Sequence, residues 1–278
     1  MISFKLRNFS QQNTNVNRID KLEISQQNTN VNRIDKLEFS QQNVPYIYYK
    51  DEYIPVVPLK VYMTWGYKSI PPKMKNHLEK LKRENPEFEF IIFDDEDCKK
   101  FLTDNFNKEI LWGFNKLVPG AYKADLWRLC ILYINGGFYI DIKLKCLNGF
   151  KLIELSESEH FVMDRPPNYI LNSFMVCKAG NPFLKKCIDE IITNIKTNYY
   201  GNDCLSPTGP GNLGKVMTHN NFNLNIDLSL PQHGEFIVYK GIGIMKGYDG
   251  YGDERKRFSK TRHYGELWNS KLIYNKDF

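Results

Sequence analysis

The strongest chemical signal in the chain is a carboxylate and an amine two residues apart, Asp141 and Lys143, at the end of an apolar run. The run follows Gly136 and Gly137, which can take the positive φ angles that end a helix. Because side chains alternate along a strand, the acid and the base are expected on one face. Open α/β sheets bind ligands at the carboxyl ends of their strands, so the pair predicts a binding site. A surface ion pair is the simpler alternative.

A second charged pair lies just upstream of the first. Asp125 and Arg128 are three residues apart within 121–134, where the pattern predicts a helix, so they share one helical face. An intrahelical ion pair is again the simpler interpretation. Trp65 ends another strand-like run, where it is either a core residue or a flat surface on which a ligand ring stacks.

Strand-like and helical patterns alternate from residue 45 onward, which predicts an α/β fold. Strands are expected at 60–65, 88–93, 138–142, 160–163 and 173–177, and helices at 72–83, 95–106, 121–134 and 182–197. The segment 206–214 is rich in glycine and proline, so we expect a loop there until about Leu213. The glycine-rich segment 240–253 is expected to form a mobile lid, with basic residues after it.

The composition excludes several classes of protein. The 278 residues are 42% hydrophobic and 25% charged, as in globular proteins and unlike disordered or collagen-like chains. The six cysteines include no C-x-x-C pair, so neither a zinc site nor a redox dithiol is indicated. The net charge of +6 is modest, and the basic cluster of Arg255, Lys256, Arg257, Lys260 and Arg262 suits a phosphate group better than a duplex.

The first 44 residues differ in kind from the rest. The segment 10–23 recurs unchanged at 25–38 and restarts at 40–43, a period of 15 residues. It is rich in Asn and Gln and has too few apolar side chains to form a core. We therefore predict a disordered tail over 1–44 and one domain over 45–278, with short helices or a partner-binding arm as the alternative for the tail.

Four motifs follow one another in a recognisable order. They are the T-W pair 64–65, the segment 85–95 that begins N-P and ends D-D, the segments A-D-x-x-R (124–128) and G-G-x-Y-x-D (136–141), and the T-G-P triplet 208–210. In this order they resemble the glycosyltransferases that carry a sugar-binding region with a DXD motif. That group contains yeast-type α-mannosyltransferases and capsular polysaccharide enzymes. A weaker match lies near 263–268.

The resemblance implies a GT-A type fold, an α/β nucleotide-binding sandwich around a central mixed sheet. It also implies transfer of a hexose-type sugar, with retention of configuration, from a nucleoside-diphosphate sugar to an acceptor hydroxyl of a glycan, protein or lipid. The residues that it places in catalysis are Asp141, Asp125 and Arg128, and we predict that Lys143 acts with them through its charge. Those that it places at the donor are Thr64, Trp65, Gly136, Gly137, Tyr139, Thr208, Gly209, Pro210 and Trp268.

Position 143 departs from the family pattern, which has a second carboxylate there that coordinates a divalent metal. The ammonium of Lys143 cannot ligate a metal. It could neutralise the diphosphate directly, or Mn²⁺ or Mg²⁺ could be held by Asp141 with His263 or Glu266. We expect the metal to be retained, because a diphosphate carries more charge than one ammonium offsets.

Two other classes remain open on the sequence alone. One is an inactive module that binds a nucleotide sugar or a glycan, and the other is an RNA-binding protein. The aromatic residues lie mostly in predicted strands and helices, which argues against RNA. The sequence shows no secretory leader and no run of about 18 apolar residues, so we expect a cytoplasmic protein of a bacterium or a virus-infected cell. The family resemblance implies a role in glycan or polysaccharide synthesis.

Overall fold

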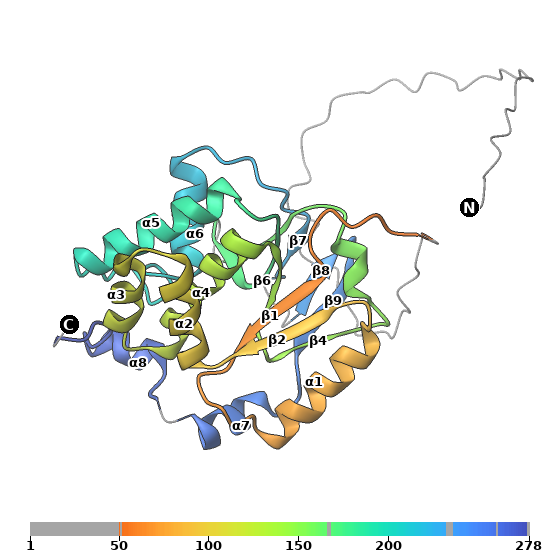
Figure 1. Ribbon diagram of the computed structural model, residues 1–278, viewed down its shortest axis with the longest axis horizontal. Coiled ribbons are helices and arrows are strands. Elements are labelled where there is room, and N and C mark those ends of the chain that lie inside the picture. The colour runs from red at the N-terminus through yellow and green to blue at the C-terminus, as the bar shows by residue number, and fades with distance from the viewer. Residues whose placement is uncertain (1–49, 51, 166–167, 232–235, 260, 277–278) are drawn as a thin grey trace, which may run out of the picture. The chain divides into compact units, whose positions relative to one another are not determined.

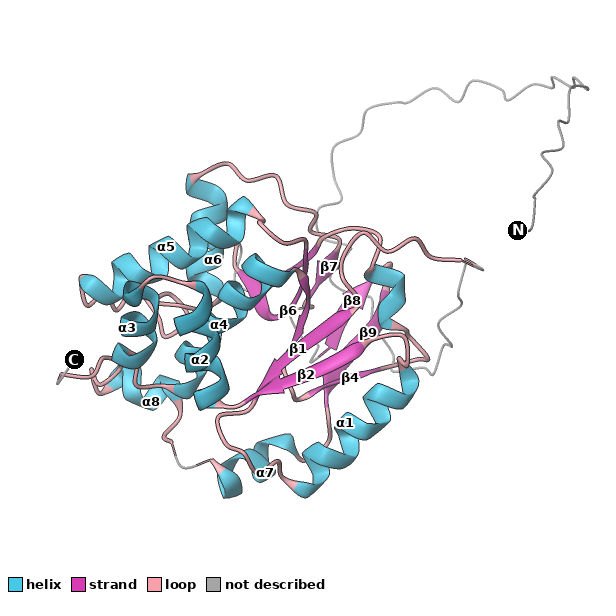
Figure 2. Ribbon diagram, viewed as in Figure 1, coloured by secondary structure: helices cyan, strands magenta, loops and turns pink. Residues whose placement is uncertain are grey.

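The computed structural model describes residues 50, 52–165, 168–231, 236–259 and 261–276. The predicted tail and Lys260 lie outside these residues. In the described part, one mixed sheet is covered by helices on both faces (Figures 1 and 2). The predicted α/β fold with a central mixed sheet is confirmed. None of the described helices is long and apolar enough to cross a bilayer.

The sheet has nine strands in the order β2-β1-β3-β6-β5-β7-β8-β9-β4. The strands are β1 (Lys60–Thr64), β2 (Glu89–Phe93), β3 (Gly137–Ile140), β4 (Leu144–Cys146), β5 (His160–Met163), β6 (Ile170–Cys177), β7 (Leu228–Ser229), β8 (Phe236–Tyr239) and β9 (Ile242–Gly247). β1 pairs in parallel with both β2 and β3, whereas β6 runs antiparallel to β3. The carboxyl ends of β1, β2 and β3 therefore meet at one edge.

The four predicted helices are present within a few residues of their expected ends, and the described residues form further helices that were not predicted. The helices are α1 (Pro72–Glu84), α2 (Asp95–Asn105), α3 (Lys108–Lys116), α4 (Gly120–Asn135), α5 (Pro182–Lys196), α6 (Pro210–His219), α7 (Tyr251–Phe258) and α8 (Tyr264–Asn269), with a short 3₁₀ turn at Leu152–Leu155. Asp94 caps α2 in a reciprocal capping box with Asp97. Gly136 ends α4 with a φ of +63°.

The two faces of the sheet are covered differently. α2 to α6 gather on one face, where the buried Trp127 of α4 lies with Ile188 and Leu184 of α5 in one apolar core (Figure 2). α1 covers the other face, and its Leu78 and Met74 belong to a second core. α4 is buried along most of its length, so the chain enters β3 from the middle of the protein.

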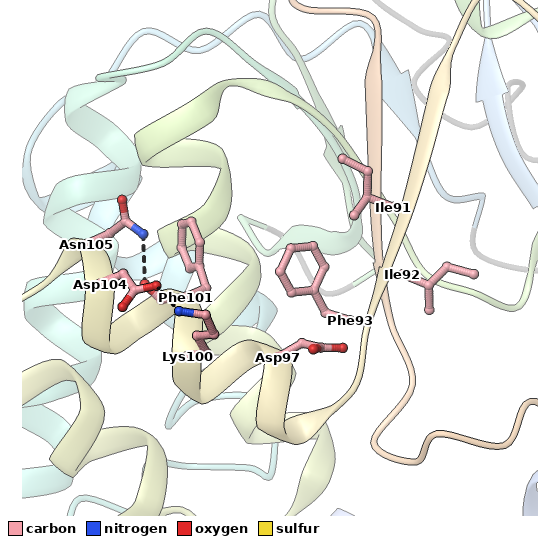
Figure 3. A pocket seen from close by; sticks show the side chains of 8 residues that line it. All are labelled: Ile91, Ile92, Phe93, Asp97, Lys100, Phe101, Asp104 and Asn105. Carbon is pink, nitrogen blue, oxygen red and sulfur yellow. Dashed lines mark hydrogen bonds and ion pairs between the residues drawn. The ribbon is translucent and has the colours of Figure 1, made fainter.

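β2 lies at an edge of the sheet, and beside it is a shallow hollow lined partly by α2 (Figure 3). Ile91 and Phe93 of β2 and Phe101 of α2 supply its apolar wall. The ion pair between Lys100 and Asp104 lies at its rim. A larger cavity lies at the carboxyl edge of the sheet. The two share no lining residue, although α2 contributes residues to both.

One prediction about the second half of the chain was wrong. The segment 206–214 is not a loop up to Leu213, because α6 begins at Pro210, and proline is favoured in the first turn of a helix. The glycine-rich segment 240–253 forms the turn and the second strand of the β8–β9 hairpin and the start of α7, with Ile244 and Met245 fully buried. Its role as a mobile lid stays a prediction.

Gly214 offers a test of how closely α6 packs. A Cβ atom there would lie 1.8 Å from the carbonyl oxygen of Asn168, so backbone must move to admit it. We expect Gly214→Ala to lower the free energy of unfolding by at least about 2 kcal/mol in urea titrations, the scale of an overpacked core. Gly252→Ala is the control, because nothing lies within 4 Å of its Cβ position in α7. It should gain up to about 1 kcal/mol, and equal effects would refute the close approach.

Candidate functional site

A cavity of about 580 Å³ opens at the carboxyl edge shared by β1 and β3. Its walls come from the segment after β1, the first turns of α2 and α4, the turn after β3, the residue after β5, the loop 204–210, and the segment that joins α7 to α8. Acidic and basic side chains both line it, among them Asp125, Arg128, Asp141 and Lys143. The structure thus brings together the four residues predicted for catalysis.

Asp125 and Arg128 do form the intrahelical ion pair, with Nη2 of the arginine 3.2 Å from Oδ1 of the acid. The pair also faces the cavity. The other carboxylate oxygen, Oδ2, accepts a hydrogen bond of 2.7 Å from the Thr208 hydroxyl, and Oδ1 accepts one of 2.9 Å from the Asn172 amide. Burial raises the pKa of Asp125, and the charge of Arg128 opposes that rise.

Arg128 links the two acids of the site. Its Nη1 atom lies 3.3 Å from Oδ1 of Asp141 and donates a hydrogen bond of 2.5 Å to the carbonyl of Asn172. Its guanidinium lies over the ring of Tyr139 at 4.3 Å from the ring centre. With only 6% of its side chain exposed, this cation is held on every side by acceptors and an aromatic face.

Both oxygens of Asp141 have partners from this chain. Oδ1 accepts a hydrogen bond of 2.9 Å from the Tyr139 hydroxyl in addition to the contact with Arg128, and Oδ2 lies 3.1 Å from Nζ of Lys143. Burial would raise the pKa of Asp141, but the charges of Lys143 and Arg128 outweigh it and lower the pKa below its usual value.

Asp141 and Lys143 meet for a reason other than the predicted one. Strand alternation does not apply, because β3 ends at Ile140. Instead the chain turns, and the amide of Leu144 donates to the carbonyl of Asp141 over 2.8 Å. The same turn is tied to the β9–α7 segment, since the amide of Tyr248 donates to the carbonyl of Lys143.

Trp65 proves to be both a core residue and part of the cavity wall. It is 8% exposed, and its indole N–H donates to the carbonyl of Ser69. Tyr67 meets it edge to face, with ring centres 5.7 Å apart, and also lines the cavity. Thr64 lines the cavity as well, and its hydroxyl donates to the carbonyl of Phe93. Trp65 and Tyr67 thus contribute aromatic rings to the cavity wall.

Other predicted donor residues are placed elsewhere. Gly136 and Gly137 lie at the opposite end of β3 from Asp141 and do not line the cavity. Gly137 has a φ of +108°, and a Cβ there would lie 2.8 Å from the carbonyl oxygen of Lys60, so this glycine serves strand packing. Trp268 also lies outside the lining, where its indole N–H donates to the carbonyl of Tyr200.

The T-G-P triplet contributes in two ways. Gly209 and Pro210 line the cavity, whereas Thr208 is fully buried behind it and orients Asp125. A Cβ at Gly209 would lie 3.4 Å from Oδ2 of Asp125. Glycine here leaves room between the loop and the acid.

The predicted metal ligands do not come together. His263 lines the cavity, but its Nδ1 atom accepts the amide of Gly265 as the N-cap of α8. Glu266 is exposed and is not part of the lining. Among the described residues no group of three or more His, Cys, Asp and Glu side chains could hold a metal ion. The donor set does not fit the metal site proposed from Asp141, His263 and Glu266, and the site that does form pairs Asp141 with an ammonium.

Two acids of the cavity were not predicted from the sequence. Asp164 follows β5 as Asp141 follows β3, and Asp95 lies in the first turn of α2. Burial raises the pKa of each. The signal for Asp164 was available, since a polar residue directly after a buried strand is the pattern that singled out Asp141.

Glu254 holds the α7 wall in place. Its Oε1 atom accepts the amide of Lys73 at 2.9 Å, and its Oε2 atom accepts the amide of Met74 at 3.0 Å and the hydroxyl of Tyr248 at 2.5 Å. These amides belong to the first turn of α1, which has no side-chain cap of its own. α7 therefore lies against α1 (Figure 1), and its Tyr251 and Arg255 reach the cavity.

Comparison with known proteins agrees with this site. Residues 71–161 match the family described as glycosyltransferase sugar-binding region containing DXD motif. The resemblance found in the sequence is thereby confirmed, and the matched segment contains Asp125, Arg128 and Asp141.

Curated relatives carry related names. The chain is 33% identical over 93 residues to an uncharacterized glycosyltransferase of Acanthamoeba polyphaga mimivirus, a match that covers 33% of this chain and 37% of the relative. It is 27% identical over 143 residues to inositol phosphoceramide mannosyltransferase 2 of Schizosaccharomyces pombe, covering 51% and 41%. It is 22% identical over 194 residues to the initiation-specific alpha-1,6-mannosyltransferase of Candida albicans, covering 55% and 50%. The matched region thus spans half or less of each relative.

Solved structures with partial similarity are glycosyltransferases. PaToxG glycosyltransferase aligns with a TM-score of 0.46 at 19% identity over 60% of this chain and 71% of its own. The UDP-bound glycosyltransferase domain from the YGT toxin aligns with a TM-score of 0.41 at 10% identity over 77% and 89%. With TM-scores below 0.5, these structures supply no residue correspondences.

Glu254→Gln should loosen α7 from α1. An amide can accept from only one of the two α1 amides, because its NH₂ group faces the other as a second donor. We expect a loss of about 1–2 kcal/mol in the free energy of unfolding and faster hydrogen exchange at the amides of Lys73 and Met74. Asp253→Asn changes an exposed neighbour in the same helix. It should alter the free energy of unfolding by less than about 0.5 kcal/mol and leave the exchange of both amides unchanged. Unchanged exchange in Glu254→Gln would show that the contact does not hold α7.

His77 of α1 should make stability depend on pH. Its ring stacks on Tyr248 at 5.0 Å between ring centres, and Nε2 is buried without a hydrogen-bond partner among the described residues. Burial lowers the pKa of His77 to about 4. A histidine with a lowered pKa protonates first in the unfolded chain, so its contribution is complete above about pH 6.5 and is lost as the pH falls toward 4.

The expected loss from His77 over that range is on the order of 1–3 kcal/mol in the free energy of unfolding. His77→Phe keeps a ring against Tyr248 and removes the titration. Urea titrations at pH 7 and pH 4.5 should therefore show a smaller difference in this variant than in the unsubstituted protein. Equal differences would mean that His77 is not the group responsible.

Proposed function

We propose that this chain is a glycosyltransferase of the GT-A type that moves a hexose-type sugar from a nucleoside-diphosphate sugar to an acceptor hydroxyl. The observation that carries the proposal is the buried network of Asp125, Arg128 and Asp141 in the wall of the cavity. This network offers two carboxylates to the hydroxyls of a sugar and a guanidinium to the attached phosphate. The match over 71–161 supports the same activity.

Each part of a nucleotide sugar has a place in the cavity. The base lies against Trp65 and Tyr67 at the end of β1. Asp141 and Asp125 accept hydrogen bonds from ribose and sugar hydroxyls, because ionised carboxylates are the strongest acceptors available there. Arg128 keeps both acids oriented, so that little reorganisation is needed when the donor binds.

The proposed reaction is a displacement at the anomeric carbon on the face that the diphosphate leaves. The bond from C1 to the diphosphate oxygen breaks with its electron pair on that oxygen, and the acceptor oxygen forms the new bond to C1. The departing oxygen takes the acceptor's proton. Asp141 is unsuited to act as a covalent nucleophile, because both its oxygens are engaged by Tyr139, Arg128 and Lys143.

The relatives guide the substrate proposals. Two of them are named mannosyltransferases, so mannose is the first sugar to test. The acceptor is proposed to be a glycan, a protein or a lipid, in glycan or polysaccharide synthesis. The rival function, a module that binds a nucleotide sugar without turnover, is an outcome of the test that follows.

Asp141→Asn should lower transfer or donor hydrolysis by at least about 100-fold, because it removes a charge from the donor site. The amide retains an oxygen for the Tyr139 hydroxyl, so a folded protein is expected by circular dichroism. The assay follows release of UDP or GDP from a panel of UDP- and GDP-sugars.

Asp189→Asn is the matched control, since it makes the same chemical change at an exposed ion pair with Lys185 on α5. It should retain full activity. Wild-type turnover in Asp141→Asn would remove this residue from the mechanism. Donor binding without turnover by the unsubstituted protein would favour the binding module.

A further inference from the structure

Lys143 occupies the place in the site where a cation is required. Its ammonium lies 3.1 Å from Oδ2 of Asp141, and its side chain is 36% exposed in the cavity wall. Asp164, the other strand-end acid, lines the same cavity; burial raises its pKa, and Arg165 and then the charge of Lys143 oppose that rise. A divalent ion bound at Asp141 would lie close to the ammonium of Lys143 and be repelled by it.

A second source of positive charge faces the same cavity. Arg255 on α7, and Arg262 and His263 before α8, are part of its lining. A diphosphate carries more negative charge than one ammonium offsets, and these residues supply the remainder. Burial and then the charge of Arg255 lower the pKa of His263, so the two arginines are the permanent cations of this wall.

Hydrogen bonds join Lys143 to the α7 wall. The carbonyl of Lys143 accepts the amide of Tyr248 at 2.8 Å, and the hydroxyl of Tyr248 donates to Glu254 at 2.5 Å. Glu254 is anchored on the first turn of α1 and directly precedes Arg255. The backbone segments that carry Lys143 and Arg255 are therefore joined by one continuous set of contacts, which favours a preorganised anion site.

We propose that Lys143, with Arg255 and Arg262, neutralises the departing diphosphate in place of a divalent metal ion. The inference rests on the proposed function and concerns how its leaving group is stabilised. As the C1–O bond breaks, the electron pair moves to the diphosphate oxygen, which lies against the ammonium of Lys143. The proton of the acceptor goes to that same oxygen, so Lys143 stays protonated throughout.

The test measures binding of UDP and GDP by calorimetry to protein treated with EDTA, with and without added Mn²⁺. At least one nucleotide should bind the metal-free protein, and Mn²⁺ should change its Kd by less than about threefold. Lys143→Met should weaken binding at least about tenfold, the scale of a lost charge-assisted contact. Lys145→Met is the control, because Lys145 pairs with Asp249 outside the cavity, and it should bind as the unsubstituted protein does.

Lys143→Asp provides a second, independent arm. It restores the two carboxylates of D-x-D, a hard-oxygen site that suits Mn²⁺ or Mg²⁺. We expect Mn²⁺ to tighten nucleotide binding at least about tenfold in this variant alone. Turnover of the unsubstituted enzyme should persist in EDTA, with the same donor that it uses in Mn²⁺.

The outcomes separate the inference from the proposed function. Nucleotide binding or turnover that requires Mn²⁺ in the unsubstituted protein would overturn the inference and leave a glycosyltransferase standing. Metal-free binding that Lys143→Met leaves unchanged would also overturn it, since another group would then hold the diphosphate. If neither nucleotide binds with or without Mn²⁺, the proposed function and the inference both fail.

Discussion

The structure of the site depends on one buried set of charges, Asp125, Arg128 and Asp141. Moving such groups out of water costs several kcal/mol each unless partners replace the lost hydration. Here every partner is supplied by the fold: Asn172 from β6, Thr208 from the loop before α6, and a tyrosine ring beneath the guanidinium. Removing one member would strand the others, at a cost of about 3–5 kcal/mol. A network of this kind is therefore rigid before any ligand arrives.

The backbone around the network explains how it can be built. α4 is buried along most of its length and delivers Asp125 and Arg128 from one face. Gly136 and Gly137 then reverse the chain where backbone comes too close for any side chain, and β3 returns to present Asp141 beside them. The glycines thus act on the site through geometry, several residues from the cavity. Antiparallel β6 adds the Asn172 amide and carbonyl from the other side of β3.

The wall formed by α7 shows how a glycine-rich segment forms regular secondary structure. Its glycines occupy a hairpin and a helix start, and Glu254 caps α1 in place of a residue of α1 itself. That cap joins segments about 180 residues apart and lies next to a cavity-lining arginine. Stability and the charge of the site are coupled here, because the residue that anchors the helix also sets the position of Arg255.

The sequence by itself determined what depends on local pattern. This covers the alternation of strands and helices, the ends of α2 and α4, and the short motifs of the sugar-binding region, because each is set by residues a few positions apart. Only the tertiary structure decided the rest. The turn after Ile140, the pairing of both Asp141 oxygens with cations and a hydroxyl, and the exposure of Glu266 each depend on contacts between distant segments. Spacing along the chain carries no information about such contacts. For this reason the metal set of Asp141, His263 and Glu266 was a reasonable prediction from motifs. Spacing did predict Lys143 beside Asp141, but not the turn that brings them together.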